Sequence, residues 1–236
     1  MKGNRSFKPY KKVGPRFVVF MYVSVIAFSL IYFILGYYLF DSQLKFYDYL
    51  IFTSILAIVV VGSYQLYFWT EYNNTQFKAK CFKIPLDDYI PHMPSFIWIY
   101  NLSYYIIIGL VIVSITSLEQ GLHYIFGGLV LLSVHCVIFY FFPSVVPEGW
   151  RKYKTKSKSA KFLKFVQNID SGRNCKPSMH MSVAMYVSLL LLPILSYYSF
   201  IFVFLIGASC LLVKQHVILD LSPGVLLGWL VYVLVL

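Results

Sequence analysis

The stretch FVVFMYVSVIAFSLIYFILGYYLF, residues 17–40, contains no charged side chain and is long enough to cross a bilayer as one helix. Further apolar runs follow it at residues 48–70, 95–117, 123–142, 180–197, 199–214 and 217–236. We predict an all-α, polytopic membrane helical bundle of six or seven transmembrane helices. The last two runs give the weakest signal, because one is short and the other contains Asp220 and Pro223.

The composition agrees with a bilayer environment. Of the 236 residues, 59% are hydrophobic and only 12% are charged, which is too apolar for an ordinary soluble domain. We expect a single membrane domain over residues 1–236, with a basic tail and two spans in residues 1–81 and the remaining spans in 82–236. The first apolar run lacks a signal-peptide cleavage pattern, so it is predicted to remain as a span.

The net charge of +11 is distributed unevenly. With seven spans, the basic residues in 2–16, 78–83 and 151–176, together with Lys214, fall on one side of the membrane, and Lys45 falls on the other. Since short loops rich in Lys and Arg stay inside, this side is predicted to be cytoplasmic. The simplest interpretation is a topology signal with attraction to anionic lipids, so the bilayer, not a nucleic acid, is the expected partner.

Two segments between the spans are predicted to lie along the membrane surface. FLKFVQNID, residues 162–170, has apolar side chains at helical spacing, which favours a short amphipathic helix. Residues 82–100 contain three prolines, which prevent a continuous helix before Ser95. An aromatic cluster is then expected to anchor the third span at the membrane boundary: Trp98, Tyr100, Tyr104 and Tyr105.

The first motif with chemical potential is KPSMH, residues 176–180, directly before an apolar run. Pro177 suits the first turn of a helix, so the amides of Ser178, Met179 and His180 are expected to point outward at a helix N-terminus. Such an end attracts anions. A phosphate bound there would also meet the Ser178 hydroxyl.

The second motif is KQHVILD, residues 214–220, between the last two apolar runs. His216 and Asp220 are four residues apart, so on a helix they share a face and the carboxylate can accept the N–H of one ring nitrogen. The other nitrogen is then free to act as a nucleophile. Lys214 is placed to neutralise phosphate oxygens.

Either motif alone is weak evidence, because Pro-Ser-x-His occurs by chance and a His-x-x-x-Asp pair is usually a helix-surface hydrogen bond. Together they lie at the open end of one helical hairpin, since the run 181–197 leads away from the membrane face and 199–214 returns to it. We therefore expect both motifs to meet at one surface.

These motifs, with IPLDDYIPHMPSFIWIY (84–100) and FFPSVVP (141–147), resemble the type 2 phosphatidic acid phosphatase superfamily, and more closely its inositol phosphorylceramide synthase-like branch. The resemblance covers about residues 82–230 and makes 82–236 a phosphatase-like catalytic core. It implies that His216 attacks phosphorus, that Asp220 orients it and that His180 protonates the leaving group. It also implies that Ser178 contacts the phosphate.

The chain departs from this family at three points. The common last motif has a Ser-Arg pair where this chain has Ser209 and Cys210, so Lys214 is expected to replace the arginine. After the segment 141–147, where the family has Arg-Pro, the chain has EGWR, and Arg151 is expected to take over. Finally, the family usually places its site outside the cytoplasm, whereas the charge pattern places it inside, so both orientations stay open.

The resemblance implies a metal-independent phosphatase that acts on phosphorylated lipids of the phosphatidic acid or prenyl phosphate type through a phosphohistidine. The phosphate-binding set is expected to comprise Ser178, Met179, Lys214, Arg151, Lys176 and Arg173. We expect no metal or cofactor, because the loops hold no acidic cluster suited to magnesium. The four cysteines lack CxxC spacing, which argues against structural zinc and a disulfide framework.

Other functions fit parts of the sequence. A lipid phosphotransferase, similar to inositol phosphorylceramide or sphingomyelin synthases, would share the covalent intermediate and pass the phosphoryl head group to a lipid acceptor. A membrane transporter predicts paired broken helices and internal symmetry, neither of which is visible in the sequence. A structural protein gives no reason for two histidines to share one pocket. The lipid, the acceptor and the oligomeric state are left open.

The remaining polar and small residues are given structural roles. His135 is expected to be a core histidine with its hydrogen bonds satisfied, and Asp170 to bind a loop cation such as Arg173. Asp87 and Asp88 are expected to cap a surface turn. Three glycines are predicted to permit close helix packing: Gly127, Gly128 and Gly207.

Overall fold

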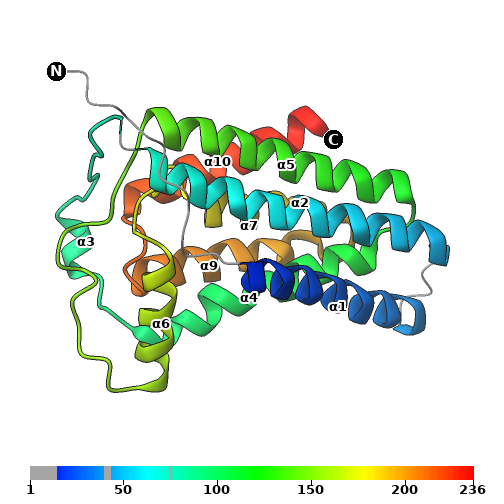
Figure 1. Ribbon diagram of the computed structural model, residues 1–236, viewed down its shortest axis with the longest axis horizontal. Coiled ribbons are helices and arrows are strands. Elements are labelled where there is room, and N and C mark those ends of the chain that lie inside the picture. The colour runs from blue at the N-terminus through cyan, green and yellow to red at the C-terminus, as the bar shows by residue number, and fades with distance from the viewer. Residues whose placement is uncertain (1–14, 40–43, 75) are drawn as a thin grey trace.

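The computed structural model describes residues 15–39, 44–74 and 76–236, and the basic tail 1–14 lies outside the described residues. The helices that form the bundle are α1 (Pro15–Leu39), α2 (Phe46–Asn73), α4 (Ile97–Ser114), α5 (Leu118–Phe141), α7 (Met179–Leu190), α9 (Ile201–Leu212) and α10 (Ile218–Val235). Outside the bundle or between its helices lie α3 (Leu86–Tyr89), α6 (Lys158–Ile169) and α8 (Leu192–Leu195), with 3-10 turns at Pro94–Phe96 and Ser196–Phe200. The bundle helices run roughly parallel or antiparallel to one another (Figure 1).

Six of the described helical segments are long and apolar enough to cross a bilayer, which confirms the prediction of an all-α, polytopic bundle. The two runs with the weakest sequence signal both qualify, as Leu192–Leu212 and Ile218–Val235. The apolar run that is too short to qualify is instead α7, which has 12 residues. Pro193 in the first turn of α8 lacks an N–H, so the α7 ladder ends before it and the chain continues as α8.

Helix α7 lies inside the bundle and packs against α10, α9, α5 and α4. Two glycines on α10 allow its close approach: a Cβ on Gly224 would lie 2.5 Å from the Ser178 carbonyl oxygen, and one on Gly228 would overlap the backbone of Ser182. These glycines lie four residues apart and therefore share one helix face. The two backbones are thus in direct contact where α7 begins.

Of the glycines expected to permit packing, Gly127 does so, because a Cβ there would overlap the Tyr186 hydroxyl. Gly207 is in close contact with the Met181 side chain, at 3.3 Å from a Cβ position. The expectation for Gly128 is wrong: no described atom lies within 4 Å of a Cβ placed there.

The loops that carry the basic residues gather at one end of the bundle, around α3 and α6 (Figure 1). The amide of Lys80 donates to the Pro143 carbonyl at 3.0 Å, and that of Met93 donates to the Leu212 carbonyl at 2.8 Å. Lys45 precedes α2 at the opposite end. The uneven charge pattern therefore corresponds to two physical ends of the described structure.

Helix α6 lies across this end, nearly perpendicular to the long helices (Figure 1). The amphipathic helix predicted at 162–170 is present, but it begins earlier, at Lys158, because the Ser157 hydroxyl accepts a hydrogen bond from the Ala160 amide at 3.1 Å. Leu163 of α6 is fully buried, so this side of the helix faces the bundle. Trp98, expected to anchor a span in the membrane, stacks on Phe162 of α6 with ring centroids 4.9 Å apart.

Candidate active site

The KPSMH segment forms the N-terminus of α7. Ser178 is the N-cap and its hydroxyl accepts a hydrogen bond from the Met181 amide at 3.4 Å. The helix begins at Met179, so the placement of Pro177 in its first turn is wrong. The Ser178 amide donates to the Asp220 carbonyl at 2.9 Å and is not free. Of the three amides expected to be free, those of Met179 and His180 have no acceptor among the described residues.

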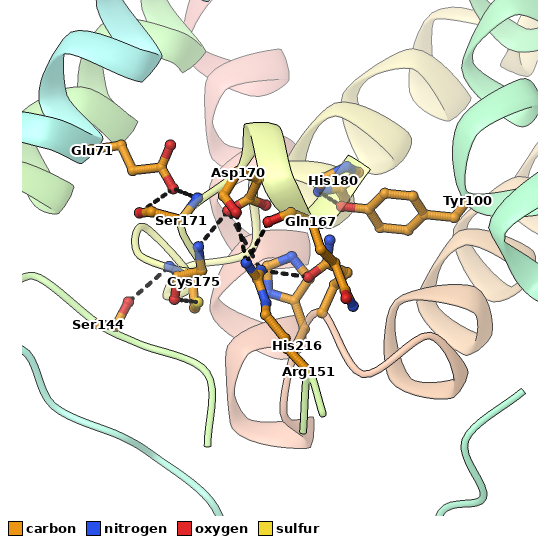
Figure 2. Close-up of polar contacts among 12 residues, drawn as sticks. Glu71, Tyr100, Ser144, Arg151, Gln167, Asp170, Ser171, Cys175, His180 and His216 are labelled. Carbon is orange, nitrogen blue, oxygen red and sulfur yellow. Dashed lines mark hydrogen bonds and ion pairs between the residues drawn. The ribbon is translucent and has the colours of Figure 1, made fainter. Parts of the chain in front are cut away.

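A neighbouring loop positions this segment. The hydroxyl of Ser144, in the FFPSVVP stretch, accepts a hydrogen bond from the Cys175 amide at 2.9 Å (Figure 2). It also accepts one from the Lys176 amide at 2.6 Å. A single side chain therefore holds the two residues that lead into the α7 N-cap. This contact joins two of the sequence motifs that lie far apart along the chain.

His216 lies in the turn between α9 and α10, not on a helix with Asp220 as expected. Its Nδ1 is nevertheless 3.4 Å from Asp220 Oδ2. That oxygen also accepts a hydrogen bond from the Val217 amide at 3.1 Å, because Asp220 caps the first turn of α10. The predicted pair therefore exists, but the helix cap brings it together.

The other ring nitrogen of His216 faces the beginning of α7. Nε2 is 3.2 Å from the Ser178 hydroxyl oxygen, and both residues are at most 5% exposed. With Nδ1–H directed at the Asp220 carboxylate, Nε2 carries the lone pair and can accept from this hydroxyl. The nitrogen with nucleophilic character thus lies beside the anion-attracting end of α7.

The His180 ring lies next to that of His216, with centroids 5.6 Å apart and the planes inclined at 65°. Its Nδ1 is 3.4 Å from the Tyr100 hydroxyl oxygen, and the Tyr104 hydroxyl donates to the His180 carbonyl at 2.8 Å. Tyr100 and Tyr104, expected from sequence to be membrane anchors, therefore contact His180. Figure 2 shows Tyr100 directed at the His180 ring.

Arg151 reaches the turn that carries the nucleophile candidate. One Nη donates to the Gln215 side-chain oxygen at 2.6 Å, and the other donates to the Asp170 carbonyl at 2.6 Å (Figure 2). The Asp170 carboxylate lies 3.5 Å from the same guanidinium. Asp170 therefore binds a loop cation, as expected, but this cation is Arg151, since Arg173 donates to Asn74 instead.

Arg151 and the two glutamines that it contacts each have a buried N–H donor without an acceptor among the described residues. These donors are Arg151 Nε, Gln215 Nε2 and Gln167 Nε2. The oxygen of the Gln167 side chain is already used by the Tyr153 hydroxyl, at 3.0 Å. Buried donors without acceptors are costly, so they mark a place for a group rich in acceptor oxygens. Gln215 is visible in the KQH motif, whereas no sequence signal pointed to Gln167.

The remaining basic residues of the predicted phosphate-binding set hold other segments. Lys214 donates from Nζ to the Asp87 carbonyl at 2.9 Å and lies 4.4 Å from the centre of the Trp150 ring. Burial lowers the pKa of Lys214 from the ordinary 10.5, and the charges of Asp87 and Asp88 oppose this shift. Lys214 is therefore part of the wall of the site, with its ammonium group bound to a backbone oxygen.

Arg173 and Lys176 are directed elsewhere. Arg173 donates to the side-chain and backbone oxygens of Asn74 at 2.8 and 2.9 Å, at the end of α2. The Lys176 ammonium lies 4.0 Å from the centre of the Phe82 ring. Of the predicted cations, Arg151 is thus the one that the structure bonds to the residue next to His216.

Asp87 has a larger role than the surface turn expected for it. It is fully buried, and its two carboxylate oxygens accept hydrogen bonds from the amides of Ile84 and Ile218 at 2.8 and 2.9 Å. Ile218 is the first residue of α10, so Asp87 ties the 82–96 loop to the helix that begins beside the site. Asp88 is exposed and pairs with Lys83.

His135 is fully buried, as expected, and its Nε2 is 2.8 Å from the Ser182 hydroxyl oxygen. That hydroxyl donates to the Ser178 carbonyl at 3.1 Å, so Nε2 of His135 is the donor in its contact. Its Nδ1 has no partner among the described residues, so the expectation of a fully satisfied ring is wrong. A chain of polar contacts therefore runs from α5 to the N-cap of α7.

Cys210 also lies at the site, at the position where the resembling family has arginine. It is fully buried, and its sulfur and one ring nitrogen each of His180 and His216 lie within 4.8 Å of one another. Among the described residues, this is the group of His, Cys, Asp and Glu side chains close enough together to hold a metal ion.

No protein-family model matches this chain, and searches of curated proteins and of solved structures find no match either.

Proposed function

We propose that this chain is a membrane-embedded, metal-independent lipid phosphatase of the type 2 phosphatidic acid phosphatase kind, and that it works through a phosphohistidine. The observation that carries the proposal is the convergence of two imidazoles. His180 and His216 are 36 residues apart in the chain, yet their ring centroids lie only 5.6 Å apart. Two rings at this spacing can act on opposite sides of one phosphoester.

In this proposal His216 is the nucleophile. The Asp220 carboxylate holds the Nδ1–H and stabilises the positive charge that develops on the ring, while the Nε2 lone pair attacks phosphorus. The 3.4 Å contact to Asp220 is long for a hydrogen bond, as is usual in a site without substrate. The Ser178 hydroxyl, now 3.2 Å from Nε2, would donate to a phosphoryl oxygen instead.

His180 is the proton donor. As the bond from His216 Nε2 to phosphorus forms, the bond to the lipid oxygen breaks and that oxygen receives the proton of His180. Neutral His180 then takes a proton from water, whose oxygen attacks the phosphohistidine. The bond between nitrogen and phosphorus breaks, and inorganic phosphate leaves.

The donors around Arg151 support an anionic ligand. Phosphate monoester hydrolysis is among the slowest uncatalysed reactions, so such a site must stabilise developing charge strongly. Arg151 Nε and the side-chain Nε2 groups of Gln215 and Gln167 supply N–H donors that no described group uses. The free amides of Met179 and His180 add the positive end of α7.

The position of the site supports a lipid substrate. The two motifs lie at the end of the bundle where the loops around α3 and α6 gather (Figure 1), and we take this end to be at the level of lipid head groups. A phosphorylated lipid can place its head there while its chains stay among the apolar helices. Phosphatidic acid and prenyl phosphates have this shape and charge.

The decisive experiment measures phosphate release by the purified chain in detergent, with phosphatidic acid and a prenyl phosphate as substrates. We expect His216→Ala and His180→Ala each to abolish release. His123→Ala is the matched control, because His123 is exposed in the first turns of α5, at the opposite end of the bundle. Unchanged turnover in either of the first two variants would exclude the mechanism.

The same assay separates hydrolysis from transfer. Rapid quenching in alkali preserves a phosphohistidine, so labelled phosphate should remain on the wild-type chain and be lost in His216→Ala. Addition of ceramide or diacylglycerol then tests the acceptor. Label that moves to the added lipid instead of to free phosphate would replace the phosphatase proposal with a phosphotransferase.

We place the basic end, and with it the site, on the cytoplasmic side, because its loops carry the Lys and Arg residues. Cys81 is exposed on a loop at this end and can report its side. Cys175 is unsuitable, since burial raises the pKa of its thiol and hides it from reagents. We expect a membrane-impermeant thiol reagent to label Cys81 slowly in intact cells. Rapid labelling would show that the basic end faces outward.

A further inference from the structure

We propose that His180, Cys210 and His216 form a binding site for one transition-metal cation of the zinc type. Their candidate ligand atoms, one from each side chain, lie within 4.8 Å of one another. They come from the first turn of α7, the last turn of α9 and the turn that follows it. Because the three residues do not form a CxxC or similar short motif, the sequence spacing does not predict this site.

The backbone holds the cysteine and one histidine in a fixed relation. The Cys210 carbonyl accepts hydrogen bonds from the amides of Gln215 and His216 at 3.1 and 3.3 Å. This closes the turn after α9 and directs the His216 side chain back toward Cys210. The sulfur therefore lies close to the ring without any motion of the chain.

The outer nitrogen of each ring already has an oxygen partner. His216 Nδ1 faces the Asp220 carboxylate and His180 Nδ1 faces the Tyr100 hydroxyl, both at 3.4 Å. Metal-bound histidines in proteins usually donate their other ring N–H to a carboxylate or a similar oxygen, which fixes the ring orientation. Each ring therefore has Nε2 left to bind a cation, which would displace the Ser178 hydroxyl from His216.

The donor set selects the class of metal. One thiolate and two imidazoles suit zinc and similar cations, whereas magnesium and calcium require oxygen ligands. On binding, the Cys210 thiol loses its proton to solvent, and the nearby Asp220 carboxylate helps to balance the charge of the cation. His180 is only partly buried, whereas Cys210 and His216 are buried.

The regulatory consequence rests on the proposed function. His216 Nε2 cannot bind a metal ion and attack phosphorus at the same time, and His180 would lose the nitrogen that carries its proton. A bound zinc ion should therefore inhibit phosphate release reversibly. Cys210, at the position where the resembling family has arginine, would then make this site sensitive to zinc.

The test uses Co²⁺ as a spectroscopic probe on the full chain in detergent, since cobalt shows charge-transfer absorption in the near ultraviolet when a thiolate binds it. We expect one cobalt ion per chain, this absorption band, and its loss when excess zinc is added. Cys210→Ala should lose the band. Cys136→Ala should keep it, because Cys136 is a buried cysteine of α5 outside the cluster.

A wild-type protein without the sulfur band, or a Cys210→Ala variant that retains it, would overturn the proposal. The wild-type measurement does not depend on whether any variant folds. A cobalt band in a protein that releases no phosphate would refute the proposed function and leave the metal site intact. Phosphate release without a cobalt band would refute the metal site and leave the proposed function intact.

Discussion

Replacing Gly224 with alanine should separate the two helices that hold the site. A Cβ at this position would lie 2.5 Å from the Ser178 carbonyl oxygen and 2.9 Å from the Met181 Cβ, whereas ordinary contact begins at 3.4 Å. Neither neighbour can rotate away, because one is backbone and the other is the first atom of a side chain. Helices α7 and α10 must therefore move apart by about 0.9 Å at this level.

That movement reaches the reacting groups. The hydrogen bond from the Ser178 amide to the Asp220 carbonyl, now 2.9 Å long, would stretch to about 3.8 Å and break. Overpacking of this kind costs about 1–3 kcal/mol in the free energy of unfolding. A displacement of about 1 Å in a catalytic group costs roughly 100-fold in rate. We therefore expect a less stable protein with at least a tenfold lower rate of phosphate release.

The assay combines thermal unfolding in detergent with initial rates of phosphate release. Gly128→Ala is the matched control, because it adds the same methyl group to α5 where no described atom lies within 4 Å. This change should raise the free energy of unfolding by about 0.5–1 kcal/mol, since alanine is the better helix former. The two variants should thus change stability in opposite directions.

If Gly224→Ala matched Gly128→Ala in both stability and rate, close contact between α7 and α10 would not be what assembles the site. A stable Gly224→Ala variant with a low rate would instead show that the site tolerates less displacement than the bundle does. Only equal stability and equal rate of the two variants would refute the role of the α7–α10 contact.

Two further predictions concern single side chains. Asp220→Asn should lower the turnover rate roughly 100- to 10,000-fold, because an amide no longer holds His216 in the right tautomer or stabilises its charge; a rate within twofold of wild type would contradict this role. For Lys214, burial lowers the folded-state pKa, so the unfolded chain binds more protons between that value and the ordinary 10.5. The free energy of unfolding should therefore rise with pH across this window, and Lys214→Arg, which does not titrate there, should remove that part of the rise; identical pH profiles of unfolding would refute it.

Several features could be read from sequence because they depend on local properties of the chain. The length of an apolar run decides whether a helix can cross a bilayer, so the bundle was predictable from stretches such as residues 17–40. The amphipathic spacing of 162–170 likewise predicted α6. The meeting of KPSMH and KQHVILD followed from one hairpin, since the two runs between them have similar lengths.

The sequence spacing gave a wrong backbone structure at two places, where a helix cap or a turn replaces the expected helix. His216 and Asp220 meet as the i and i+4 rule predicts, yet they do so through the N-cap of α10, and His216 itself is not helical. Pro177 precedes α7 because Ser178 is the better cap. In both cases the residue pair was predictable and the backbone around it was not.

The partners of the charged residues could be decided only by the tertiary structure. Arg151 binds Gln215 and Asp170, Arg173 binds Asn74, and Lys214 binds the Asp87 carbonyl. A long cationic side chain reaches any acceptor within several ångströms, so its partner depends on which loops share one end of the bundle. The same holds for Cys210, whose place between two imidazoles arises from three separate segments. Sequence alone determined the helices and the motifs, because hydrophobic length and spacing act locally, whereas the pocket required the packing of helices that bring distant residues into contact.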